Sequence, residues 1–372
     1  MLIPLGFLAA SGAGGAAYYL QMLASQVEFS ENITVDANDD FYVVGRSQYL
    51  SAGSYDLLLV KFNAAGIIQW QRVLGGASIE YGTGVTIDSS GYIVVVGYTG
   101  STGAGGDDVL IAKYDSSGTI QWQRTLGHTG LDEGRSIATD SSDNIYLVGF
   151  TAAPGGGLFD ILVAKYNSVG SLLWQKLLGL GDYEFGEGIT VNSIGEIFVV
   201  GQSGSVGAGG RDAILVKYNS SGVVQWQRAL GGSSNELNNE VTTDTSGNIY
   251  VTGSTASAGT VSNALLIAKY NSSGTLQWQR ILGGAVNNPG YSIALDVSNN
   301  VYVVGDHTNT NPQSLIAKYD SSGTIQWQRR IDINKLGRLM SILRVMFICL
   351  EAQEQVEELG ECFLLTYLKT AA

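Results

Sequence analysis

The chain has 372 residues and a formal net charge of −13, with 45% hydrophobic but only 14% charged residues. Disordered chains of this length usually carry more charge and fewer β-branched and aromatic residues, so the composition predicts a folded protein with a sizeable core. The acidic balance excludes the basic footprint that nucleic-acid binding requires. No stretch supplies the ~18 uncharged apolar residues of a membrane-spanning helix, so no membrane span is predicted.

Residues 1–27 precede the first repeat and are predicted to form a leader or an attachment segment. Their opening, MLIPLGFLAASGAGGAA, joins an apolar run to small residues, as secretory signal peptides do, although no Lys or Arg precedes the run. The first residues, MLIPLGFLAASG, also resemble the start of many virion-associated proteins of tailed phages. Export and attachment to a virion are therefore both open interpretations of this segment.

A repeat occupies residues 28–331. Its tryptophans, at positions 70, 122, 174, 226, 278 and 327, are 52 residues apart, except for a last interval of 49. Each lies in a phrase such as TIQWQRTLG, preceded by a phrase such as LIAKYD, with segments such as SIATD and NIYLVGF further upstream. Every unit thus contains four short segments rich in Ile, Val, Leu, Tyr and Trp, which is typical of β-strands.

Four strands per unit, with no helix between units, predict an all-β fold: a β-propeller of four-stranded antiparallel blades, of which six are complete. A β-solenoid is the alternative. The strands are apolar on both faces, as blades packed between two neighbours must be, whereas a sandwich would show cleaner alternation. Tight turns such as DSSG join strands within a unit, because Asp and Ser bond to their own backbone and Gly tolerates positive φ.

Two phrases, D-x-L-I-A-K-Y-D-S-S-G-T-I-Q-W-Q-R and S-I-A-x-D-S-S-G-N-I-Y-V-V-G, recur along residues 30–330. In these phrases the chain resembles the β-propeller repeat family of bacterial and phage surface proteins, which is named for seven-bladed propellers. The resemblance implies the propeller fold and brings no catalytic residues with it. His128 and His307 lie at non-equivalent positions, and the repeats contain no nucleophile elbow, Walker loop or cysteine, so no enzymatic activity is predicted.

Acidic residues recur at the long connections between strands. Because neighbouring strands run in opposite directions, the two tight turns of each blade share one face and the two long connections share the other, here called the long-loop face. One acidic series lies five residues before the blade lysine and a second lies ten residues after the blade tryptophan. These candidate binding residues are Asp56, Asp108, Asp160, Asp212, Glu80, Asp132, Glu184 and Glu236, whereas Ala264, Gln313 and Asn288 interrupt the series in the later units.

Two interpretations of the acidic series are open. The carboxylates can form an acidic face that attracts a cation or a basic partner. Alternatively, they cap backbone N–H groups of the loops or pair with the blade lysines, which are Lys61, Lys113, Lys165 and Lys217. Calcium is conceivable, but a ring of single carboxylates lacks the clustered oxygens of a strong site, so no metal and no cofactor are predicted.

Residues 332–372 do not follow the repeat, although a seventh unit should begin there. With suitable synonymous codons, Met340 to Glu358 is encoded by DNA whose third-base frame reads VDSSGNVYLSGGTGAGGG, the opening of such a unit. We therefore expect an out-of-frame remnant of a seventh blade, either disordered or helical, since Leu, Met, Glu and Gln also favour a true helix. Stop codons in that frame of the coding DNA would refute this expectation.

The function predicted from these features is binding without catalysis. The first hypothesis is a virion or tail-associated phage protein that contacts a protein or glycan partner through the long-loop face. The second is a secreted or surface-exposed bacterial propeller that acts as an interaction scaffold. The expected location is accordingly a virion, the cell surface or the extracellular space. Neighbouring capsid or tail genes would favour the first hypothesis, and cleavage of the N-terminus would favour the second.

Overall fold

The computed structural model describes residues 28–48, 54–152, 158–179, 181–207, 209–257, 263–283, 287–307 and 313–332. The predicted leader, residues 1–27, lies outside the described residues, and so does the predicted seventh-blade remnant, residues 332–372, apart from Asp332, which ends strand β24. In the described part of the chain, no helix is long and apolar enough to cross a membrane.

The described residues form twenty-four strands in six sheets, and each sheet holds four antiparallel strands that neighbour one another in chain order. We call the sheets blades 1 to 6. The strands of blades 1 to 3 are β1 (Glu28–Val35), β2 (Phe41–Ser47), β3 (Asp56–Phe62), β4 (Ile68–Leu74), β5 (Glu80–Ile87), β6 (Ile93–Thr99), β7 (Asp108–Tyr114), β8 (Ile120–Leu126), β9 (Asp132–Thr139), β10 (Ile145–Thr151), β11 (Asp160–Tyr166) and β12 (Leu172–Leu178). Those of blades 4 to 6 are β13 (Glu184–Val191), β14 (Ile197–Ser203), β15 (Asp212–Tyr218), β16 (Val224–Leu230), β17 (Glu236–Thr243), β18 (Ile249–Thr255), β19 (Ala264–Tyr270), β20 (Leu276–Leu282), β21 (Gly290–Leu295), β22 (Val301–His307), β23 (Gln313–Tyr319) and β24 (Ile325–Asp332).

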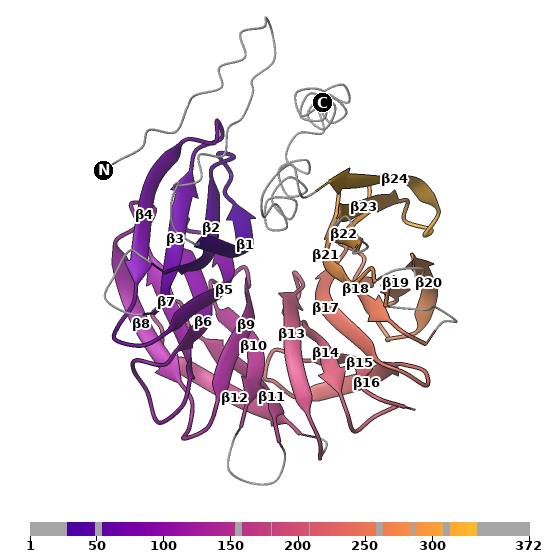
Figure 1. The fold of residues 1–372 in the computed structure, drawn as a ribbon, viewed down its shortest axis with the longest axis horizontal. Helices are drawn as coiled ribbons and strands as arrows, with labels where there is room; N and C mark the ends of the chain where they lie inside the picture. Colours follow the sequence, from indigo (N-terminus) through magenta and orange to yellow (C-terminus); the bar gives the residue numbers. More distant parts are fainter. Residues whose placement is uncertain are drawn as a thin grey trace, which may run out of the picture.

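The blades are arranged radially around an axis (Figure 1). The first strand of each blade is innermost, and these strands pack on one another in the order β1, β5, β9, β13, β17 and β21. Among the described residues no comparable contact joins β21 to β1, so the ring is open between blade 6 and blade 1. This arrangement confirms the predicted β-propeller with six four-stranded blades. The solenoid alternative is wrong, because strand ladders run within blades and not from one unit to the next.

Burial follows the position of each strand in its blade. All seven residues of the third strand β7 are buried, whereas the outermost strand of the same blade, β8, is exposed or half-buried throughout. The central strands are covered on both faces because a neighbouring blade lies on each side. This explains why LIAKY-type segments are almost entirely apolar, while Gln and Arg alternate with Trp in the outermost strands.

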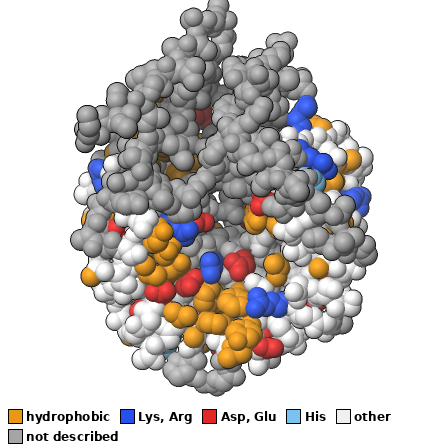
Figure 2. Space-filling view, viewed as in Figure 1, with side chains coloured by type: hydrophobic (Ala, Val, Ile, Leu, Met, Phe, Trp, Pro, Cys, Tyr) orange, Lys and Arg blue, Asp and Glu red, His pale blue; other side chains and the backbone are white. Residues whose placement is uncertain are grey.

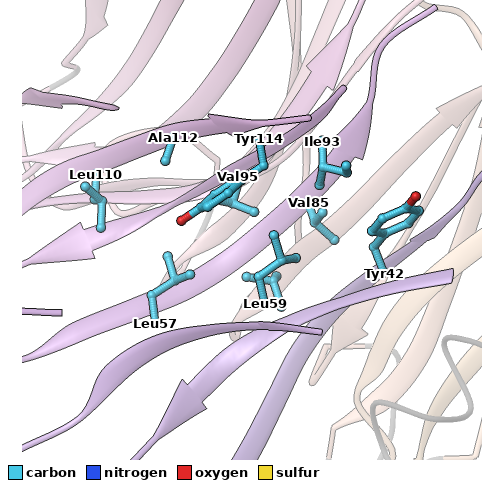
Figure 3. Packing of buried hydrophobic residues seen from close by; sticks show 10 residues of the cluster. Tyr42, Leu57, Leu59, Val85, Ile93, Val95, Leu110, Ala112 and Tyr114 are labelled. Carbon is cyan, nitrogen blue, oxygen red and sulfur yellow. The ribbon is translucent and has the colours of Figure 1, made fainter. Parts of the chain in front are cut away.

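Packing between blades forms the core. Figure 3 shows the first such interface, in which Tyr42, Leu57 and Leu59 of blade 1 face side chains of blade 2. Ile93 and Val95 on the blade 2 side are completely buried. Blades 2 to 6 pack in the same way, and each interface has its own apolar cluster. Burial of apolar side chains contributes roughly 25 cal/mol per Å², so these interfaces are the main source of stability.

The tight turns within blades are closed by their first Asp or Asn, as their sequences predicted. Asp140 illustrates the chemistry: its Oδ1 accepts hydrogen bonds from the backbone N–H groups of Ser142 and Asn144, at 2.9 and 3.0 Å. In the equivalent turn of blade 2, Gly91 has a φ of 81°, a left-handed conformation that glycine adopts without strain. These turns fix the strand register and hold the long connections on the opposite face.

Candidate functional site

The predicted acidic residues lie where the long connections meet the strands, but inside the blades. Seven of the eight are at most 2% exposed, and only Asp160 is half-buried. The buried members are Asp56, Asp108, Asp212, Glu80, Asp132, Glu184 and Glu236. An exposed acidic face is therefore not formed by this set, because seven of its eight side chains are buried.

The contacts of these carboxylates agree with the loop-capping interpretation. Glu80 accepts hydrogen bonds from the backbone N–H of Gly76 and from the hydroxyl of Thr99, each at 2.7 Å. Asp108 accepts a hydrogen bond from the backbone N–H of Ala104 at 2.9 Å. Glu236 repeats the contacts of Glu80, with Gly232 and Thr255 as its donors. Carboxylates with several such donors organise the loops of the long-loop face.

Pairing with the blade lysines does not account for the acidic series. Lys61 pairs with Asp40 at 2.9 Å, Lys113 with Asp88 at 2.6 Å and Lys217 with Glu196 at 2.7 Å. The partners are acidic residues of the tight turns. An extended chain rises about 3.3 Å per residue, so a lysine five residues along the strand lies ~17 Å from the acid, at the opposite face.

Acids from adjacent blades do approach one another at the long-loop face. Burial raises the pKa of Asp108, and the nearby carboxylate of Asp132 raises it further. Burial and the carboxylate of Glu236 likewise raise the pKa of Asp212. Within the described residues, no group of three or more His, Cys, Asp or Glu side chains is placed to hold a metal ion.

A different set of residues converges on the axis of the ring. The innermost strand of every blade contains a β-bulge, at which one residue is skipped in the pairing with the second strand. These bulge residues are spaced by 52 and are all partly exposed: Glu31, Thr83, Arg135, Glu187, Asn239 and Tyr291. A bulge re-aims a side chain relative to the regular pleat, which brings one residue of each blade to the axis.

The bulge residues line a cavity of about 230 Å³ together with three neighbouring residues, Asn32, Ser136 and Glu240. We call this cavity the channel. Its lining is polar, with the carboxylates of Glu31, Glu187 and Glu240 and the guanidinium of Arg135. Polar groups that converge on a cavity can fix the orientation of a ligand and supply specificity.

Some bulge residues join neighbouring blades. The hydroxyl of Thr83 donates a hydrogen bond to the carbonyl oxygen of Gly134 at 2.8 Å, and the side-chain amide of Asn239 donates one to the carbonyl oxygen of Gly290. Tyr291 donates from its hydroxyl to Asp306 within its own blade, at 3.1 Å. Thr83, Asn239 and Tyr291 therefore have hydrogen-bonding roles inside the protein.

Arg135 and Glu187 provide the channel with opposite charges on blades 3 and 4. Arg135 forms an ion pair with Glu133 at 2.9 Å, and its buried Nε atom has no hydrogen-bond partner among the described residues. Burial raises the pKa of the Glu187 carboxyl, while Arg135 and a hydrogen bond with Gln202 oppose the rise. Charged groups held with incomplete pairing in a cavity can bind a charged or hydrogen-bonding ligand.

The raised pKa of Glu187 predicts a pH-dependent effect of replacing it by glutamine. A carboxyl whose folded pKa is raised adds stability below its unfolded pKa, and this contribution is lost as the pH rises through the folded pKa. Glutamine mimics the protonated form. The variant E187Q should therefore match the wild type in acid and become the more stable protein as the pH rises. Urea unfolding of both proteins from roughly pH 4 to pH 8 measures this difference. A difference that does not change with pH would contradict the prediction.

An arc of aromatic side chains surrounds the channel at the long-loop face in blades 1 to 4. The ring centroids of Tyr81 and Tyr98 are 4.8 Å apart, and those of Phe159 and Phe185 are 5.2 Å apart. The complete aromatic arc comprises Tyr55, Tyr81, Tyr98, Phe150, Phe159, Tyr183 and Phe185. Figure 2 shows hydrophobic side chains gathered beside acidic and basic ones around the centre of one face of the ring.

Arginines lie over the rings of this arc. The guanidinium of Arg46 is 4.4 Å from the ring centroid of Tyr81, and that of Arg211 is 5.5 Å from the centroid of Phe185. Arg135 reaches from the channel to within 5.2 Å of the Phe150 centroid. Such cation–π contacts hold the guanidinium groups in place, so the arc presents fixed aromatic surfaces and fixed donors together.

One feature of the sequence does indicate the channel residues, although the acidic series is easier to notice. At the bulge the repeat becomes irregular: Thr83, Arg135 and Glu187 each follow a glycine, at a register in which neighbouring units have different polar residues. The spacing of 52 is as regular there as it is for the tryptophans. The residue at the bulge varies between units while the residues around it repeat. Such a position is a better indication of a ligand-binding role than an acidic residue that recurs at the same place in each unit.

Comparison with known proteins agrees with this architecture. Residues 225–259 match the family model described as "Beta-propeller repeat". The chain is also similar to an uncharacterized WD repeat-containing protein of Acanthamoeba polyphaga mimivirus, with 26% identity over 294 residues, which is 66% of this chain and 19% of that protein. The chain thus spans about a fifth of the length of its curated relative.

Solved structures show the same fold. One is a candidate 6-phosphogluconolactonase from Bacteroides uniformis, with a TM-score of 0.51, 14% identity, and coverage of 78% of this chain and 82% of that chain. Another is an ulvan lyase of polysaccharide lyase family PL25, with a TM-score of 0.50, 12% identity, and coverage of 83% and 88%. At these identities the likeness extends to the fold and not to the activity.

Proposed function

Because this chain is a β-propeller repeat protein, we propose that it is a non-enzymatic binding module that captures a basic polypeptide segment at the long-loop end of its channel. The observation that carries the proposal is the set of six bulge residues. They differ from blade to blade, although the strands around them repeat, and all six line one cavity. Function usually depends on such variable positions above a rigid scaffold.

The charge of the channel sets the preferred partner. Glu31, Glu187 and Glu240 outnumber Arg135 in its lining, and the whole chain has a net charge of −13. A Lys or Arg side chain entering the channel would meet carboxylates, and the surrounding negative potential would increase its rate of association. The aromatic arc offers Tyr and Phe beside arginines, a composition enriched at protein–protein interfaces.

Selection from a random peptide library by the immobilised full-length protein tests this proposal. Wild-type protein should select peptides with Lys or Arg, and E187Q should weaken their binding ~10-fold, with a smaller salt dependence, because one attracting charge is lost. The variant D115N is the matched control. It makes the same change of charge on the tight-turn face and keeps the oxygen that caps its turn.

Tyr183→Ala provides a second arm, since it removes one ring of the arc without altering the charge. The proposal is supported if both Y183A and E187Q weaken the selected peptides and D115N does not. Peptide binding that none of these changes affects would contradict it. Binding confined to oligosaccharides on a glycan panel would instead identify a glycan receptor.

We also propose a setting on a virion or at a cell surface. The similarity to a mimivirus protein supports a viral setting, although it does not distinguish a tail from any other structure. Mass spectrometry of purified virions would detect the protein if it is a virion component. Its recovery only from the surface or the medium of bacterial cells would favour the secreted or surface-exposed scaffold instead.

A further inference from the structure

Backbone hydrogen bonds join the long connections of neighbouring blades and set two acidic positions side by side. At the junction of blades 2 and 3, the N–H of Asp132 donates to the carbonyl oxygen of Asp107 at 2.6 Å. This bond places Asp132, the first residue of β9, next to Asp108, the first residue of β7. Equivalent bonds run from Glu80 to Tyr55, from Glu184 to Phe159, from Glu236 to Arg211 and from Asn288 to Asn263.

The two carboxylates at the junction of blades 2 and 3 are buried together. A Cβ added at Gly127 would lie 2.1 Å from Oδ1 of Asp108 and 2.9 Å from Oδ2 of Asp132, so both carboxylates border this glycine. Asp108 is 2% exposed and Asp132 is 0% exposed. Among the described residues, no Lys or Arg forms an ion pair with either of them. Two buried like charges without a basic partner require a compensating positive charge.

Blade 3 also differs from its neighbours in what its acid can reach. In blades 2, 4 and 5 a glutamate accepts a hydrogen bond from a hydroxyl on the second strand: Glu80 from Thr99 at 2.7 Å, Glu184 from Ser203 at 2.8 Å and Glu236 from Thr255 at 2.9 Å. Asp132 is one methylene group shorter, and its cross-strand neighbour is Thr151. Oδ1 of Asp132 and Oγ1 of Thr151 are both buried and have no hydrogen-bond partner in the described part of the chain. The shorter side chain thus leaves two buried oxygens without a contact.

The oxygens at this junction are the kind that calcium prefers. Ca²⁺ binds roughly six to eight oxygens from carboxylates, carbonyl groups and water, in a geometry more flexible than that of Mg²⁺. The carboxylates of Asp108 and Asp132 and the hydroxyl of Thr151 supply part of such a set, and loop carbonyl oxygens and water would complete it. A site with only two carboxylates is expected to be weak, in the range of ~0.1–1 mM that is common in extracellular modules.

We propose that the junction of blades 2 and 3 binds one calcium ion between the carboxylates of Asp108 and Asp132, with the Thr151 hydroxyl as a further ligand. The ion compensates the two buried charges and takes the place of the longer glutamate of the neighbouring blades. Because Asp108 also holds the backbone N–H of Ala104, the ion fastens the long connection of blade 2 to the start of blade 3. These residues do not line the channel, so the inference does not depend on the proposed peptide binding.

Calorimetric titration of calcium chloride into the full-length protein, treated with EDTA and desalted, tests the proposal. The wild type should bind one ion, and D108N should bind it at least ~10-fold more weakly, because a charged ligand is lost. D132E is the sharper variant, since it keeps the charge and gives blade 3 the glutamate of its neighbours. Its carboxylate should reach Thr151 as Glu80 reaches Thr99, so calcium binding should be lost. D115N is the matched control, which removes the same charge on the tight-turn face and should bind as the wild type does.

Thermal unfolding is the second measurement, and it shows whether each variant folds. Calcium chloride at ~10 mM should raise the melting temperature of the wild type by at least ~3 °C relative to potassium chloride of the same ionic strength. The melting temperature of D132E should not respond. The proposal is overturned if the wild type neither binds calcium nor is stabilised by it; a D132E variant that then melts above the wild type would show that only water occupies the junction. Calcium binding that D108N and D132E both leave unchanged also overturns it, because the ion then lies elsewhere.

Discussion

Replacing Gly149 by alanine is expected to destabilise the protein by about 3–5 kcal/mol, among the largest effects of a single substitution. A Cβ at this position would be 1.9 Å from the carbonyl oxygen of Glu133 on the neighbouring innermost strand. That atom belongs to the backbone of the bulge and cannot rotate away. The same conflict arises at Gly97 and Gly201, where the distances are 1.7 and 1.9 Å. The missing side chain is what allows each bulge to direct its residue to the channel.

Gly91→Ala is the control for this prediction. Gly91 has a left-handed φ of 81° and nothing within 4 Å of an added Cβ, so alanine there meets backbone strain alone. That strain costs about 1–2 kcal/mol. Equilibrium unfolding in guanidinium chloride should rank the variants in the order wild type, G91A, G149A. Equal losses for the two variants would show that the bulge rearranges to accommodate a methyl group.

Asp88→Ala is expected to cost about 3–4 kcal/mol, because it leaves the buried ammonium of Lys113 without its counter-ion. The two groups are 2.6 Å apart, and their side chains are 1% and 6% exposed. Lys113 also donates a hydrogen bond to the carbonyl oxygen of Ser168 in blade 3. Asp88 accepts hydrogen bonds from the backbone N–H groups of Ser90 and Tyr92. One carboxylate thus closes a turn and neutralises a lysine that links two blades.

Asp115→Ala separates these two roles. Asp115 closes the other tight turn of the same blade through the same kind of hydrogen bonds, from Ser117 and Thr119, but it is partly exposed, and no lysine of the described residues pairs with it. Its replacement should cause only a small loss. The double variant Asp88→Ala, Lys113→Met should recover part of the stability lost in D88A, since no unpaired charge stays buried. Denaturant titration of the four proteins would refute this assignment if D88A and D115A lost equal stability.

The fold follows from local features of the sequence. The 52-residue spacing of the tryptophans, the strand-length apolar segments and the Asp-Ser-Gly turns all act within one unit or between adjacent units. Trp122 illustrates why such features are reliable: its ring lies on Gly170 and its indole N–H bonds to Ser168, one unit away. Repeats that contact only their neighbours leave a signal at a single period.

The candidate site was harder to foresee, because it exists only where the blades meet. Arg135 and Glu187 lie in different sheets and come together through the curvature of the ring, which no single unit encodes. The acidic series misled for a physical reason. Asp108 and Glu80 are charged and begin strands next to loops, where surface residues are common, yet their carboxylates accept hydrogen bonds from Ala104 and Gly76 and are buried.

The confinement of each channel residue to one bulge has an evolutionary consequence. A blade contacts only the blades beside it, so unequal recombination between similar repeats can add, remove or reorder whole units without rewriting the remaining interfaces. Every such event also changes which side chains line the channel and their order around the axis. A substitution at Thr83 or Asn239 has the same kind of effect. Such chains could therefore diversify in specificity at the bulge positions while the interfaces between blades stay the same.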